Sequence, residues 1–219
     1  MPLYEFSAEG TTGCKKAAKI LMLADRMADS LSKEGIIMDE EREIVRFGLE
    51  SLEGNLLGIV LTLTIGICFK RVGEAIFLWL WLFPLRKNAG GYHASTKVRC
   101  FFISAVMLIV AFVLFTVFEH TMVFYGICAM AAGCVIWTLA PVDNLTKRLD
   151  VLEHKIYQKR TRIALGLEGV MFGVALFCKW EMAVRSICMT FFIVMISLLM
   201  GIIELTLYDK FSGRINKMR

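Results

Sequence analysis

The chain has 219 residues, of which 57% are hydrophobic, and a formal net charge of +5. Together with a mean hydropathy of +0.63, this hydrophobic content excludes an ordinary soluble domain, in which roughly 45 to 50% of the residues are apolar. The positive charge does not indicate nucleic-acid binding, since no groove-reading or base-stacking pattern accompanies it. The composition therefore predicts an all-α, polytopic integral membrane protein.

The N-terminal region, residues 1–47, is expected to remain on the cytoplasmic side. It lacks the apolar core of a cleavable signal peptide. Over residues 15–33, apolar side chains recur at helical spacing opposite charged ones, which predicts an amphipathic helix at the inner membrane surface. Acidic residues at 39–41 then favour the start of a second helix, which we expect to continue into the membrane.

The membrane domain, residues 48–209, is predicted to contain about six transmembrane helices. A crossing helix needs about 20 residues, so the second of the six apolar runs, with 14 residues, is short. A basic loop over residues 141–162, with a short helix at 149–160, and a basic tail at 210–219 complete the predicted layout. The apolar runs lie at about Gly48–Phe69, Val72–Leu85, Phe101–Phe118, Met122–Ala140, Ile163–Cys178 and Ala183–Leu207.

The basic residues predict the orientation of these helices. If the N-terminus is cytoplasmic and all six runs cross, the basic residues fall on the cytoplasmic side with the exception of Lys70, Arg71, Lys179 and Arg185. The positive-inside rule thus places both termini and the segment 86–100 in the cytoplasm. Basic clusters beside the membrane also attract anionic lipid heads, so membrane lipid is an expected partner.

The segment 86–100, RKNAGGYHASTKVRC, places His93 seven residues before Cys100. Such a pair suggests thiol catalysis, in which the imidazole takes the thiol proton and the thiolate attacks a carbonyl. On one straight helix the two residues would lie about 10.5 Å apart along the axis, too far for proton transfer. The chain must therefore bend between them, and Gly90 and Gly91 permit the backbone angles of a turn.

A second helix is expected to start just before the cysteine. Ser95 or Thr96 is suited to the N-cap position, which would place Cys100 near the first turn, where the helix dipole favours a thiolate. A closed metal site is not expected, because one His and one Cys lack the paired ligands that such sites use. No cofactor is predicted.

Four carboxylates within the apolar runs are candidate functional residues, because charge is costly there. They are predicted to share one polar cavity, although each is as easily explained by snorkelling or by pairing with a basic residue. One of them, or Asp143, could orient His93 as the third group does in a catalytic triad. Two basic residues are assigned to a peptide carboxylate or to lipid heads. The carboxylates are Glu50, Glu53, Glu168 and Glu204, and the basic pair is Arg86 and Lys87.

Two motifs, LRKNAGGYHASTKVRC and LAPVDNLTKRL, resemble those of the accessory gene regulator B family. These membrane cysteine endopeptidases mature peptide quorum-sensing signals in Gram-positive bacteria. The similarity is carried by Arg86, Gly91, His93 and Cys100, whereas Arg148 stands where a proline often follows the lysine.

The resemblance implies a reaction and a partner. Cys100 would cleave the C-terminal part of a short amphipathic propeptide through an acyl-enzyme, and an internal cysteine or serine would then close a thiolactone or lactone. The residues by themselves do not exclude two other functions. One is a membrane transporter or channel component, and the other is a noncatalytic scaffold that delivers a peptide. Small residues at 126, 129 and 133 also leave a homodimer open.

Overall fold

A computed structural model of the chain describes residues 26–27, 29–34, 38, 41–92, 97–117, 121–143 and 150–217. The described residues are helical apart from short connectors, which confirms the predicted all-α class. They fall into two units, Met1–Gly58 and Ile59–Arg219, each of which is considered by itself. Of the amphipathic helix expected at 15–33, residues 15–25 and 28 lie outside the described part, and residues 29–33 are helical.

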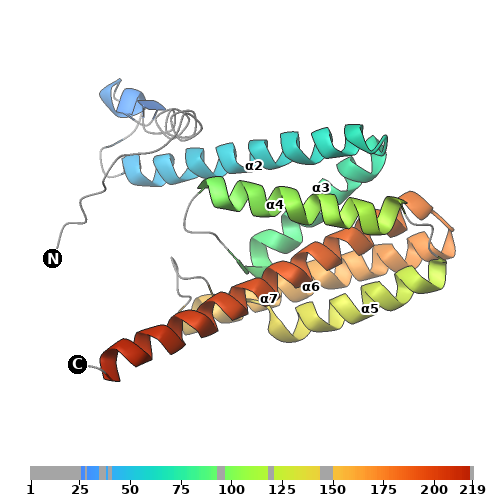
Figure 1. Cartoon of the computed structure of the whole chain (residues 1–219). Coiled ribbons are helices and arrows are strands. Elements are labelled where there is room, and N and C mark those ends of the chain that lie inside the picture. Colours follow the sequence, from blue (N-terminus) through green and yellow to red (C-terminus); the bar gives the residue numbers. More distant parts are fainter. Residues whose placement is uncertain are drawn as a thin grey trace. The chain divides into compact units, whose positions relative to one another are not determined.

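Within the described residues, each of the apolar runs predicted from the sequence falls largely on a helix. In the part of the chain that the structure describes, four segments are long and apolar enough to cross a membrane: Arg42–Cys68, Val98–Phe115, Met122–Leu139 and Glu181–Tyr208. The chain is accordingly a helical membrane protein. The helices are α2 (Arg42–Cys68), α3 (Val72–Ala89), α4 (Lys97–Phe112) with the π-helical turn η2 (Val113–Val117), α5 (Met122–Leu139), α6 (Val151–Phe177) and α7 (Glu181–Lys217) (Figure 1).

Helix α6 differs from the sequence prediction. The expected short helix at 149–160 and the fifth apolar run form one continuous helix of 27 residues. Its start is fixed by a capping box, in which the Asp150 side chain accepts from the Val151 amide at 2.8 Å and Glu153 reaches back to the Asp150 amide at 3.4 Å. Because no proline or glycine interrupts residues 151–165, the basic stretch is helical and leads directly into the apolar one.

Helix α7 lies at the centre of the second unit. It contacts α3, α4, α5 and α6, and its most apolar stretch is 61% buried, compared with 22% for the corresponding stretch of α5. Buried hydroxyls on α7 donate to its own backbone, with Ser186 Oγ bonded to the Met182 carbonyl at 2.8 Å and Thr190 Oγ1 to the Ser186 carbonyl at 3.0 Å. These polar groups are therefore satisfied within the core.

An ion-pair cluster joins the start of α3 to α7. The Glu74 carboxylate is buried and accepts from Arg185 at 3.1 Å and from Arg71 at 3.2 Å. Arg185 also pairs with Glu181 at 3.1 Å. A buried carboxylate requires such partners, because a charge removed from water without one is strongly destabilising. The cluster therefore fixes this end of α3 against α7.

The outer faces of the helices carry apolar side chains. Phe102 on α4 is 63% exposed and Ile127 on α5 is 65% exposed, and on α2 of the first unit Phe47 is 75% exposed. Soluble monomers rarely expose apolar surface so extensively. These faces are suited to lipid, in agreement with the membrane-crossing helices.

Candidate active site

Helix α3 ends in a tight backbone turn at Gly90 and Gly91, where φ is 72° and 107°. Residues that carry a side chain rarely adopt these backbone angles. A Cβ at Gly90 would lie 2.4 Å from the Val142 carbonyl oxygen, and one at Gly91 would lie 2.8 Å from Ser197 Oγ. Both positions therefore require glycine, for their conformation and for the close approach of other groups.

The turn pairs with the segment that follows the cis Ala140–Pro141 bond. The Val142 amide donates to the Ala89 carbonyl at 3.1 Å, and the Gly91 amide donates to the Val142 carbonyl at 3.4 Å. Gly90 and Val142 thus form an isolated parallel bridge. This pairing joins the two sequence motifs, which lie about 50 residues apart, and of the second motif residues 144–149 lie outside the described part.

Helix α7 also contacts the glycine turn and forms hydrogen bonds with residues next to it. The Tyr92 amide donates to the Ser197 carbonyl at 2.9 Å, and Arg86 donates through Nη1 to Ser197 Oγ at 2.8 Å. Gly201, one helical turn further along, lets the backbone of Gly91 and Tyr92 approach α7. Sequence reasoning missed Ser197 and Gly201, whose one signal is a pair of small residues at i and i+4 in an apolar helix.

Cys100 lies in the first turn of α4, as predicted, and is a half-buried free thiol. The positive end of the helix dipole favours negative charge at this position. His93 and the expected capping residues Ser95 and Thr96 lie outside the described residues. The structure thus defines both flanks of the segment that carries His93, ending at Tyr92 and resuming at Lys97.

Arg86 supplies a positive charge to the site. It follows the second apolar run, is half-buried, and interacts electrostatically with Cys100. Burial lowers the pKa of its guanidinium, and negative charge on Cys100 raises it. Since arginine remains protonated even so, the site holds a cation whose charge acts on Cys100. Lys87 is exposed instead, with Nζ 5.8 Å from the Phe83 ring centroid.

Asp143 follows the bridged residue Val142. Its Oδ1 atom is buried and has no hydrogen-bond partner among the residues that the structure describes. Through the bridge, Asp143 comes next to a backbone turn that ends one residue before His93. An unpaired buried carboxylate oxygen is costly, so this atom is available to accept a hydrogen bond from that segment.

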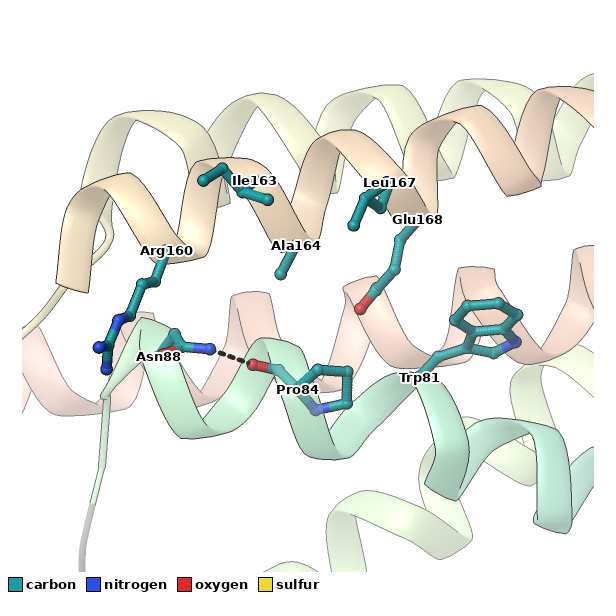
Figure 2. A pocket seen from close by; sticks show the side chains of 8 residues that line it. All are labelled: Trp81, Pro84, Asn88, Arg160, Ile163, Ala164, Leu167 and Glu168. Atoms are coloured by element: carbon teal, nitrogen blue, oxygen red, sulfur yellow. Dashed lines mark hydrogen bonds between the residues drawn. The ribbon is translucent and has the colours of Figure 1, made fainter. Parts of the chain in front are cut away.

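The four carboxylates of the apolar runs are distributed over several helices. Glu50 and Glu53 belong to the first unit, where Glu50 lies 3.8 Å from Arg46 and both Glu53 oxygens are buried without a partner in the described ranges. Glu204 is half-buried on α7. Of the four, Glu168 lines a cavity of about 340 Å³ between α3 and α6 (Figure 2).

Across the described ranges, no group of three or more His, Cys, Asp and Glu side chains is placed to hold a metal ion. The chemistry that the arrangement offers is that of a thiol at a helix start that is affected by the charge of a guanidinium. A glycine turn that leads into a histidine precedes it in the sequence. Fold and site together define a polytopic helical membrane protein with a cysteine-centred candidate site next to its apolar helices.

The chain belongs to a known family. The model of the family described as Accessory gene regulator B matches residues 24–208, a range that includes both motifs and all of the site described above. The chain therefore has a role in the accessory gene regulator system.

Curated relatives carry names of the same family. An AgrB-like protein 2 of Clostridium perfringens strain 13 is 27% identical over 61% of this chain. The match covers 66% of that relative's own length, which is slightly less than two thirds of it. An AgrB-like protein of Listeria monocytogenes serotype 4a is 29% identical over 70% of this chain and 76% of its own length. No solved structure matches the chain.

Proposed function

We propose that the protein is a membrane-embedded cysteine endopeptidase that cleaves a short signal propeptide and promotes its cyclisation. The observation that carries this proposal is the placement of Cys100 in the first turn of α4, where it interacts with the Arg86 guanidinium. The family membership supports the same conclusion. A buried cysteine in an apolar helix, such as Cys188, has neither feature.

His93 serves as the general base of the proposed reaction. It takes the Cys100 proton, and the thiolate attacks the carbonyl carbon of the scissile peptide bond. The tetrahedral intermediate collapses to a thioester when the C–N bond breaks, and His93 returns the proton to the leaving amine. The C-terminal fragment then departs with a free amino group.

In the second half of the proposed reaction, an internal cysteine or serine of the propeptide attacks the thioester. His93 accepts its proton, the new thioester or ester closes the ring, and the Cys100 sulfur leaves and is reprotonated. Water must be kept out, because hydrolysis would release a linear acid instead. The backbone amides at the start of α4 are suited to stabilising the oxyanion in both halves.

Three residues around the turn are assigned supporting roles. Arg86, held by Ser197 at 2.8 Å, stabilises negative charge on the Cys100 sulfur. Asp143, with its unpaired buried oxygen, accepts from the second ring nitrogen of His93 and so fixes the tautomer, as the third group of a triad does. Lys87, which is exposed, contacts lipid heads or a peptide carboxylate.

The proposed setting is the cell membrane of a Gram-positive bacterium, with six crossings and both termini in the cytoplasm. The four membrane-crossing segments support a multi-pass arrangement, and the basic residues support the orientation. The partner is a short amphipathic propeptide, which can lie at the same interface as the N-terminal region. A homodimer is a further proposal, which cross-linking in native membranes would test.

The proposal is tested by co-expressing the chain with a tagged candidate propeptide. Cys100→Ala and His93→Ala are expected to abolish cleavage while membrane insertion and protein level match wild type. Cys188→Ala serves as the matched control, because it removes a buried thiol outside the site, and it should retain cleavage. Persistent cleavage in either site variant would refute the proposal.

A further inference from the structure

The cavity between α3 and α6 contains a buried acidic group without a partner. Glu168 is 2% exposed, and neither of its carboxylate oxygens has a hydrogen-bond partner among the described residues. Figure 2 shows its carboxylate directed from α6 into the space facing α3. A buried carboxyl needs hydrogen-bond partners whether it is ionised or neutral, so the missing partner is expected to come from a ligand.

The opposite end of the cavity has the complementary chemistry. Arg160 lies on α6 two helical turns before Glu168, and Asn88 of α3 lies near it (Figure 2). Eight residues of helix place Arg160 and Glu168 about 12 Å apart along the axis. The cavity therefore offers a cation and an amide at one end and hydrogen-bond acceptors at the other.

Apolar groups line the cavity between these ends. Trp81 and Pro84 form the α3 side, and Ala164 and Leu167 form the α6 side. Leu167 is 65% exposed, so the cavity is accessible from the outside. A ligand that fits must combine N–H donors, a carbonyl or carboxylate group and apolar side chains over about 12 Å.

We infer that the α3–α6 cavity binds three to four residues of the peptide substrate in an extended conformation, with Glu168 accepting from peptide N–H groups and Arg160 binding a carbonyl or carboxylate oxygen. At about 3.3 Å per residue, such a segment spans the 12 Å between the two ends. A phospholipid fits less well, because its polar groups lie at one end of the molecule and leave only acyl chain for the other polar end of the cavity. The inference rests on the proposed function for the identity of the peptide.

The position of the cavity relates it to the candidate active site. Asn88, at the Arg160 end, precedes the turn residue Gly90 by two positions, and its side chain donates to the Pro84 carbonyl at 2.7 Å. One end of the cavity is thus close in sequence to the glycine turn, on the same helix. A peptide bound there would have its chain directed toward the segment that carries His93.

The test is photocrosslinking in membranes that contain the full chain and the tagged candidate propeptide. A photoreactive p-benzoylphenylalanine is introduced as Leu167→p-benzoylphenylalanine in a Cys100→Ala background, which removes the nucleophile. The matched control carries the same residue at Gly169, where a side chain would meet open space. Crosslinking to the propeptide is expected from position 167 and not from position 169.

Glu168→Leu is expected to lower the crosslinking yield by about tenfold. Loss of a hydrogen bond to a charged group weakens binding by about this factor. This variant should fold at least as stably as wild type, because it replaces an unpaired buried carboxyl with an apolar side chain. Ala164→Phe, which fills the cavity, should have the same effect on yield.

The outcomes separate this inference from the proposed function. Any one of three results would overturn the cavity site, even where Cys100 of the wild-type chain forms a peptide adduct. These results are the absence of a propeptide crosslink from position 167, an unchanged crosslinking yield in Glu168→Leu, and a phospholipid as the crosslinked species. A specific crosslink from position 167, together with a wild-type chain in which Cys100 never forms an adduct, would retain the cavity as a peptide site and overturn the endopeptidase.

Discussion

Gly201→Ala tests whether the contact between α7 and the glycine turn positions His93, the proposed catalytic base. A Cβ at residue 201 would lie 3.0 Å from the Gly91 carbonyl carbon and from the Tyr92 amide nitrogen. Preferred separations of such atoms are about 3.5 to 4.0 Å, so the turn must move by roughly 0.5 Å. That movement would also stretch the 2.9 Å hydrogen bond from Tyr92 to Ser197.

The expected effect on the reaction is larger than the effect on folding. A misplacement of about 1 Å costs about 100-fold in rate, so a shift of half that size predicts about a tenfold loss. Alanine is favoured over glycine within a helix by about 1 kcal/mol, which offsets part of the overpacking cost of about 1 to 3 kcal/mol. The net loss in the free energy of unfolding is therefore about 0 to 2 kcal/mol.

The assay measures the initial rate of Cys100 acylation by the propeptide, together with the thermal unfolding midpoint in detergent. Gly169→Ala on α6 is the matched control, because its Cβ meets open space, and its rate should equal that of wild type. A wild-type rate in folded Gly201→Ala would refute the idea that this contact positions the histidine.

Three further substitutions have expected outcomes. Arg185→Leu leaves Glu74 with one of its two arginine partners and should lower the free energy of unfolding by about 3 kcal/mol, measured by thermal unfolding in detergent. Arg86→Gln should slow alkylation of Cys100 by iodoacetamide about fivefold at pH 7, because a nearby charge is worth roughly 1 kcal/mol. Asp143→Asn should lower kcat at least tenfold with little change in KM, because it disturbs the histidine tautomer and not substrate binding.

Each of these has a control that could contradict it. The double variant in which Glu74 and Arg185 are both replaced by Leu should recover most of the lost stability, and failure to recover would show that the ion pair is not the cause. Exposed Lys87→Gln should leave alkylation unchanged, and an equal effect there would indicate a general loss of charge. An unchanged kcat in Asp143→Asn would exclude it as the positioning residue.

The local features of the site could be predicted from the sequence. Helix-starting residues after the glycine pair predicted that Cys100 would lie in a first turn, and α4 begins at Lys97. Two adjacent glycines predicted a turn, and both have positive φ. These signals succeed because capping and backbone freedom depend on a few neighbouring residues.

The long-range contacts could not be predicted in this way. Ser197 and Gly201 lie more than 100 residues after the turn that they contact, and nothing in their neighbourhood distinguishes them from other small residues in an apolar helix. The pairing of Gly90 with Val142 likewise depends on how helices pack. The expectation that four carboxylates share one cavity was based on their depth in the runs, which does not specify the face of the helix on which each lies.

The central claim is that Cys100 is the nucleophile, and trapping its adduct tests this most directly. The chain is co-expressed with the tagged propeptide as wild type and as Cys100→Ser, and denatured samples are examined by mass spectrometry. We expect a hydroxylamine-sensitive peptide thioester on Cys100, a peptide ester on the introduced serine, and neither in His93→Ala. A propeptide that is cleaved without any adduct at position 100, or cleaved by Cys100→Ala, would contradict the claim.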